Sequence, residues 1–169
     1  MKVLSLIFIL LSSISYGQDY LAFPTDDARW SNALYDVLEH EDGGYYYELN
    51  SLTYYCGTGA DTTIGVENYK IIEYCGGDYK GAIRDDEGVV YFIPKDSLTD
   101  LVLYDYTAEA GDTVFNVYVD DMDELIEFVV TDVTTDEVGG ITRRIMHSSH
   151  HSWIEGIGCE KGLFTNHYT

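Results

Sequence analysis

The chain has 169 residues, and its 9 basic residues face 30 acidic ones, which gives a formal net charge of −21 at neutral pH. Such an acidic chain is repelled by nucleic acid and by anionic membrane surfaces, so both are excluded as partners. The length predicts one domain, which is large enough to bury a core without depending on crosslinks.

Residues 1–17 have the pattern of a secretory signal peptide. Lys2 gives a positive start, an apolar core of about a dozen residues follows, and Ser15 and Gly17 put small residues at the positions that a signal peptidase reads. The apolar run is too short to span a membrane. Cleavage after Gly17 leaves a mature domain over residues 18–169, in which 8 basic residues face 30 acidic ones for a formal charge of −22. We therefore expect a secreted protein, in the periplasm, at the cell surface or outside the cell.

From Ala28 onward the sequence predicts strand after strand. Tyr, Val, Ile, Phe and Thr are abundant, with 16 tyrosines, and Gly, Asp and Asn separate the short apolar runs. We expect about ten strands, over residues 28–38, 44–56, 62–75, 79–85, 88–94, 101–106, 112–120, 125–134, 140–147 and 151–157. The short connections favour antiparallel pairing, and so many strands either pack as a sandwich or close into a barrel. The sequence thus predicts a single all-β, antiparallel domain, barrel-like or sandwich, with Val89 to Ile93 as a central strand because it is apolar on both faces.

Three cysteines in an oxidising compartment leave one outside a disulfide. A two-residue hairpin turn at Gly65-Val66 would bring Cys56 and Cys75 opposite each other, at a separation that a disulfide bridges. Gly57 to Gly59 invite a bulge that would shift this register. We predict a disulfide between Cys56 and Cys75, with Cys159 outside it.

The histidines His147, His150 and His151 are the clearest candidates for chemistry. In a straight strand His147 and His151 lie about 13 Å apart, which is too far for one metal ion. In a turn, all three would converge with an acidic residue around zinc or copper. Ser152 lies beside them, but no Gly-x-Ser-x-Gly motif is present for a nucleophile. The alternative interpretation is a polar hairpin tip.

Two further patterns allow a functional and a structural interpretation. The acidic run Asp120 to Glu124 resembles a calcium loop in charge, but it lacks the spacing of a recognised one, so a solvated turn is the alternative. The tyrosines at 45–47 and 54–55 would form a stacking platform for a glycan, or they would pack in the core and between strands.

Glu155 lies between Trp153 and Ile157 in a segment with the pattern of a late strand. Arg84 and Arg143 lie within or beside apolar strands, where an unpaired charge is costly. We expect Glu155 to form a structural ion pair with one of these arginines.

A series of short motifs runs along the mature chain in a characteristic order. They are Phe23-Pro24, Ala28-x-Trp30, Asp61-Thr-Thr-Ile64, Tyr69-Lys70, Gly81-Ala-Ile-Arg-Asp85, Val90-Tyr-Phe92, Leu103-Tyr-Asp-Tyr106, Gly111-Asp-Thr113, Arg143-Arg144, Trp153-Ile-Glu-Gly-Ile-Gly158 and Gly162-Leu-Phe164. This order resembles a large family of secreted proteins of unknown function from the Bacteroidetes, whose members often carry a C-terminal sorting domain of the type IX secretion system. That domain is absent from this chain, and Cys159 stands where the family usually has Ser. The resemblance implies export but no activity.

These patterns together favour an exported, non-enzymatic module without a cofactor. Such a module binds an extracellular glycan or small ligand, or serves as a structural part of a surface assembly. The alternative is a secreted hydrolase or metal-dependent enzyme that uses His147, His150 and His151. A deep cavity would favour ligand binding, whereas a packed interior would favour a structural role.

Overall fold

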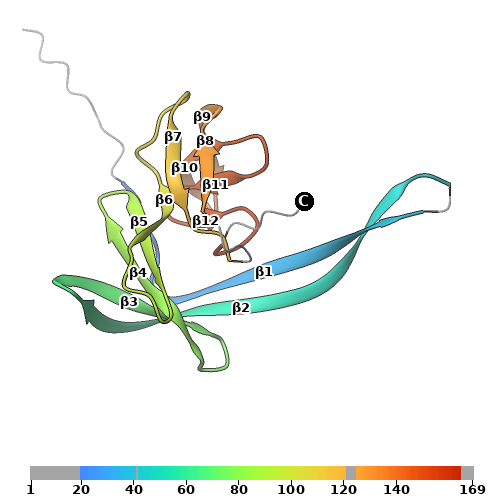
Figure 1. Ribbon diagram of the computed structural model, residues 1–169. Helices are drawn as coiled ribbons and strands as arrows, with labels where there is room; N and C mark the ends of the chain where they lie inside the picture. The colour runs from blue at the N-terminus through green and yellow to red at the C-terminus, as the bar shows by residue number, and fades with distance from the viewer. Residues whose placement is uncertain (1–19, 41, 121–124, 165–169) are drawn as a thin grey trace, which may run out of the picture.

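The computed structural model describes residues 20–40, 42–120 and 125–164, which form twelve strands and no helix (Figure 1). This confirms the predicted all-β class, and the described part of the chain has no helix that would cross a membrane. The strands are β1 (Asp26–Glu39), β2 (Tyr45–Ile64), β3 (Glu67–Tyr74), β4 (Tyr79–Asp86), β5 (Val89–Pro94), β6 (Leu101–Asp105), β7 (Thr113–Val117), β8 (Ile126–Val129), β9 (Asp132–Val138), β10 (Ile141–His147), β11 (Ser152–Ile154) and β12 (Gly158–Cys159).

The strands form two sheets. The larger sheet follows chain order from β1 to β8, and the smaller sheet has the order β12-β11-β10-β9. The predicted strand over 125–134 is in fact two strands, because the chain leaves the larger sheet after Val129 and enters the smaller one at Asp132. The expectation of antiparallel pairing throughout is wrong for β6 and β7, which run parallel where Val102 lies opposite Val117. Residues 106–112 must turn back past β6 to allow this.

The two sheets share one core. The larger sheet curls into a half-barrel, and the smaller sheet packs against it. Trp153 of β11 stacks on Phe128 of β8 with ring centroids 3.6 Å apart, and it meets Tyr104 of β6 edge-on at 5.6 Å. These three side chains are almost completely buried. As predicted, β5 is a central strand, and its Val90 and Phe92 are fully buried.

The segment after β11 closes one end of this core. The expected strand over 151–157 ends at Ile154, because a turn with Gly156 at a φ of 66° follows and leads into the short strand β12. Asn32 of β1 then holds the chain end: its side-chain amide donates to the Phe164 carbonyl at 2.7 Å and accepts from the Leu163 amide at 2.8 Å. Gly162 passes so close to Asn32 that a Cβ there would lie 2.3 Å from its side chain.

The predicted disulfide between Cys56 and Cys75 is present, with Cα atoms 5.2 Å apart. The register around Gly65, which has a φ of 65°, is the expected one near the turn. A bulge between Gly57 and Asp61 then shifts the pairing, so that Cys56 lies opposite Glu73 and the bridge joins diagonal neighbours. Cys159 is buried and takes no part in a disulfide.

Strands β1 and β2 extend far beyond the body as a two-stranded ribbon (Figure 1). Of the 20 residues of β2, only those from Tyr55 to Ile64 pair with β3, and β1 is the edge strand of the sheet. We call residues 31–54 the arm. Strands of five or six residues are usual, and an isolated two-stranded hairpin is marginally stable in water. The arm is therefore the feature of the fold that needs explaining.

Candidate functional site

The arm has an apolar face that solvent reaches. Tyr35 lies opposite Leu49, Val37 opposite Tyr47 and Glu39 opposite Tyr45. Directly opposite residues of an antiparallel pair share a face, and so do residues two apart along a strand. A bulge at Asn50 shifts the register of β2, so that Leu52 and Tyr54, which lie opposite Ala33 and Ser31, share this face as well. One face thus carries seven large side chains, each 39–70 % exposed: Tyr35, Val37, Tyr45, Tyr47, Leu49, Leu52 and Tyr54. We call this set the apolar face.

The opposite face of the arm, which we call the acidic face, carries the opposed acidic pair Asp36 and Glu48 together with Leu34, Leu38 and Tyr46. Asp36 lies directly opposite Glu48, and the side-chain amide of Asn50 donates to both carboxylate oxygens of Asp36 at 2.9 Å. Like charges in this position repel each other unless water solvates them. The sequence has no lysine or arginine between Arg29 and Lys70. Solvent therefore suits the charged pair on the acidic face, whereas the apolar face offers mainly apolar side chains to it.

An alternating antiparallel ribbon normally packs its apolar face on a core and leaves the polar face in water. Toward the tip of the arm, no described residue of the body covers the apolar face, as the exposed fractions of Tyr45 at 70 % and Tyr47 at 65 % show. At the root, Tyr35 borders a hollow that body residues 157–162 also line. A contiguous exposed apolar patch of this kind marks an interaction site. The arm is our principal candidate site.

Arg29 marks the inner end of the apolar face, where the arm joins the body. It lies opposite Cys56, and its guanidinium sits over the Tyr54 ring at 4.4 Å. Among the described residues no carboxylate forms an ion pair with Arg29, whereas Lys70 and Arg84 both have one. This exposed cation is available to an acidic group from outside the chain.

The root of the arm is firmly attached. Trp30 stacks on Phe23 with the rings nearly parallel, and its indole N–H donates to the Ile157 carbonyl at 3.2 Å. On the other strand, the disulfide ties Cys56 to Cys75. A ribbon fixed at its root by aromatic packing and a covalent bridge holds its apolar face in a defined direction.

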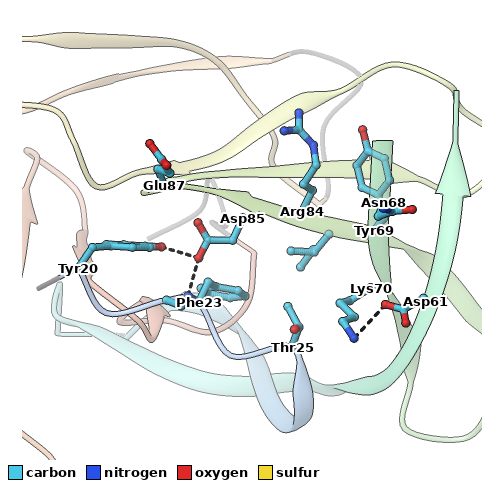
Figure 2. Close-up of a pocket in the computed structure, with 12 residues that line it drawn as sticks. Tyr20, Phe23, Thr25, Asp61, Asn68, Tyr69, Lys70, Arg84, Asp85 and Glu87 are labelled. Atoms are coloured by element: carbon cyan, nitrogen blue, oxygen red, sulfur yellow. Dashed lines mark hydrogen bonds and ion pairs between the residues drawn. The ribbon is translucent and has the colours of Figure 1, made fainter. Parts of the chain in front are cut away.

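A second candidate is a groove of about 480 Å³ between residues 20–25 and strands β3 and β4 (Figure 2). Its polar groups bind one another. Asp85 accepts hydrogen bonds from the Tyr20 hydroxyl at 2.6 Å and from the Phe23 amide at 2.7 Å, and Lys70 pairs with Asp61 at 2.9 Å. Burial and then the bond to Asp85 raise the pKa of Tyr20, which keeps the phenol a donor.

Arg84 completes one wall of the groove. Its guanidinium pairs with Asp86 at 2.8 Å and Asp100 at 3.0 Å, and it stacks over the Tyr91 ring at 4.5 Å. The charged side chains of the groove thus pair with other residues of the same chain. These contacts hold the N-terminal segment on the sheet and leave the groove as a structural feature.

Glu155 is buried, but its partners differ from those predicted. Its carboxylate accepts hydrogen bonds from the backbone amides of Leu21 and Arg144, both at 3.2 Å. Arg143 donates instead to the Glu155 backbone carbonyl at 2.8 Å, and Arg84 lies in the groove. The expected ion pair is therefore wrong within the described residues. Glu155 joins the N-terminal segment to β10 through backbone amides, a role that no sequence pattern identifies.

The three histidines do not converge. His147 lies between Ser152 at 3.0 Å and Thr134 at 2.9 Å, one at each ring nitrogen, whereas His151 is buried against Phe128 and His150 is exposed. Among the residues that the structure describes, no group of three His, Cys, Asp or Glu side chains is placed to hold a metal. The structure thus does not assemble the predicted metal site.

The contact between His147 and Ser152 also lacks the third member of a hydrolase triad. The second ring nitrogen of His147 faces a threonine hydroxyl, where a triad needs an acid that orients the base. His147 and Ser152 are direct neighbours across β10 and β11, and such a pair is ordinary sheet packing.

A buried ion pair between Lys80 and Asp120 is the feature that sequence reasoning missed. Both side chains are nearly enclosed, and the Asp120 carboxylate also accepts from the Tyr55 hydroxyl. Burial opposes the charge on Lys80, but the hydrogen bond and the charge of Asp120 outweigh it and raise the pKa of Lys80. The predicted calcium loop starts at Asp120, and its residues 121–124 lie outside the described residues. The sequence feature that could have predicted this ion pair is the position of Lys80, directly before the buried stretch Gly81 to Ile83, where a lysine needs a counter-charge.

Comparisons with family models, with curated proteins and with solved structures give no match for this chain. The functional argument therefore depends on the geometry of the arm and of the groove.

Proposed function

We propose that this protein is an exported, non-enzymatic module that binds a protein partner through the apolar face of the arm. The observation that carries this proposal is the placement of seven large, exposed apolar side chains on one face of a ribbon whose other face carries the opposed acidic pair Asp36 and Glu48. The body supports the same conclusion, because its core is filled by interlocking aromatic side chains and the described groove binds its own charges.

Export has independent support from the cysteines. A disulfide forms and persists in oxidising compartments, and the bridge between Cys56 and Cys75 lies at the root of the arm. The signal-peptide pattern of residues 1–17 and the strongly acidic composition are in accord with a soluble secreted domain.

A glycan is the second candidate partner, because four of the seven side chains are tyrosines that would stack on sugar rings: Tyr35, Tyr45, Tyr47 and Tyr54. However, Val37, Leu49 and Leu52 lie among them, and these aliphatic side chains offer no hydrogen bonds to hydroxyl groups. The mixture of aromatic and aliphatic residues favours the apolar surface of a protein.

The proposal is tested by a photo-crosslinking amino acid at Tyr47 in cells that export the full chain. The matched control places the same group at Val66, which is 91 % exposed in the turn between β2 and β3 and lies off the arm. We expect a discrete protein adduct from position 47 and none from position 66. No adduct from position 47, or the same adducts from both positions, would contradict the proposal. A glycan-array signal that Tyr47→Ala abolishes would support the sugar instead.

A further inference from the structure

We propose that a second copy of this chain covers the apolar face, with the two arms packed face to face and antiparallel about a two-fold axis near residue 34. This inference rests on the proposed function and names its partner.

The charges at the two ends of the apolar face match each other. Arg29 at the root and Glu39 at the tip point to the same side of β1, because they are ten residues apart in a strand with a two-residue period. A second arm that runs in the opposite direction would place its Glu39 over the first Arg29, and two-fold symmetry would form the reciprocal pair at the other end. Arg29 is exposed and has no ion pair within the described residues, so its guanidinium is available to the Glu39 of a second copy.

The side chains between these ends also match in size. About an axis near residue 34, β1 lies over its counterpart, so Tyr35 of one copy faces the small Ala33 of the other. On β2, Leu49 faces Leu52, and Tyr47 faces Tyr54, because the β1–β2 register carries the same symmetry across the ribbon. Two packed sheets interdigitate well when a large side chain of one sheet faces a small one of the other, and when aromatic rings face each other.

The exposed area is of the right size. The seven half-exposed side chains offer on the order of 600 Å² per copy, against about 800 Å² per partner in a standard interface, and Arg29 and Glu39 add to it. Asp36 and Glu48 lie on the opposite face and point away from the contact. The net negative charge of the chain thus opposes association only at long range, where salt screens it.

The test is sedimentation velocity of the purified full-length mature chain, from nanomolar to high micromolar concentration. We expect the wild-type chain to dimerise. R29E and E39R each replace two attractive contacts per dimer with repulsive ones, so each should weaken dimerisation by about tenfold or more. The double variant R29E/E39R restores the pairs in reversed order and should recover the wild-type dissociation constant to within about threefold.

The matched control is E48R, which changes the net charge by the same amount as E39R but lies on the acidic face. It should leave the dissociation constant close to the wild-type value. A chain that stays monomeric at every concentration overturns the inference, and so does a dimer that neither reversal weakens or that E48R weakens as much as E39R.

The crosslink at Tyr47 separates this inference from the proposed function. An adduct at twice the mass of the chain supports both. An adduct of any other mass, from a chain that is monomeric alone, overturns the second copy but leaves the arm as the binding surface.

Discussion

The body and the arm both have strands rich in large apolar side chains, but their surroundings are opposite. In the body, Phe92 of β5 is fully buried, because Tyr118 and Phe164 pack against its ring. In the arm, Tyr47 of β2 is 65 % exposed, although it is also a large aromatic side chain on a strand. The comparison teaches that the apolar side chains of a strand identify which face needs covering, but not whether the body or another molecule covers it.

The edges of the strands differ in the same way. Body strands such as β4 and β5 have a neighbour on each side, whereas β2 between Tyr45 and Tyr54 pairs only with β1. Unpaired edges and a bare apolar face make the arm a region that a second molecule can complete. We therefore expect core variants to affect folding and arm variants to affect association.

Trp153→Ala gives the largest expected loss. Trp153 is fully buried and stacked on Phe128, so its removal leaves a cavity and should cost about 4 kcal/mol in the free energy of unfolding. Tyr47→Ala on the arm should change the stability of the monomer by about 0.5 kcal/mol or less. Urea unfolding at low protein concentration measures both. Equal losses for the two variants would remove the distinction between body and arm.

Asp120→Asn should cost about 3 kcal/mol, because it leaves the nearly enclosed ammonium group of Lys80 without its counter-charge. Asp36→Asn makes the same change on the solvated acidic face of the arm and should have little effect. Urea midpoints of the two variants give the comparison. If Asp120→Asn is as stable as the wild type, the buried ion pair does not contribute as described.

Acid should destabilise the body through His151. Burial, reinforced by Lys161 and His150, lowers the pKa of His151 to about 4, below the usual value of about 6.5 in an unfolded chain. Between these two pKa values the unfolded chain binds more protons than the folded one. The free energy of unfolding therefore decreases as the pH is lowered from about 6.5 to about 4, by up to about 3 kcal/mol. Above the upper value this contribution is fully present.

The measurement is the urea midpoint of three proteins from pH 7 to pH 4. His151→Met should have a shallower decline than the wild type, and His40→Gln on the exposed tip of the arm should follow the wild type. Identical declines for the wild type and His151→Met would show that this histidine does not act as the acid-sensitive group.

Among the body variants, Glu155→Gln should have the smallest effect on the free energy of unfolding, about 1 to 2 kcal/mol. The amide keeps the shape, but it has one acceptor oxygen for the two backbone amides of Leu21 and Arg144 and has lost the charge that strengthens those bonds. Glu48→Gln on the arm serves as the control, and thermal unfolding measures both. A variant with wild-type stability would mean that Glu155 does not hold the N-terminal segment.

The features that sequence predicted are those that local patterns determine. Alternation predicted most strands, and the turn at Gly65 brought Cys56 and Cys75 within reach of each other even though a bulge shifted their register. The partners of Glu155 and the pairing of Lys80 with Asp120 depend on contacts between residues far apart in the chain. No spacing within one segment encodes them.

The arm shows the same division. Its strands were predicted at 28–38 and 44–56. The first prediction is close to the observed bounds of β1, whereas β2 continues to Ile64. The tyrosines at 45–47 were recognised as either a binding platform or core packing. Tyr45 and Tyr47 proved to be exposed on one face. The sequence could not decide this, because an apolar face has the same pattern whether it meets the body or another molecule.

Hydrogen exchange at two protein concentrations tests most directly whether association covers the apolar face. The amides of the arm, at residues 33–39 and 45–54, should exchange more slowly at high micromolar than at low micromolar concentration, because the second arm shields and stabilises the ribbon. Amides of β5, in the middle of the body, should exchange at the same rate in both samples. Arm amides whose exchange is fast and independent of concentration would contradict the account.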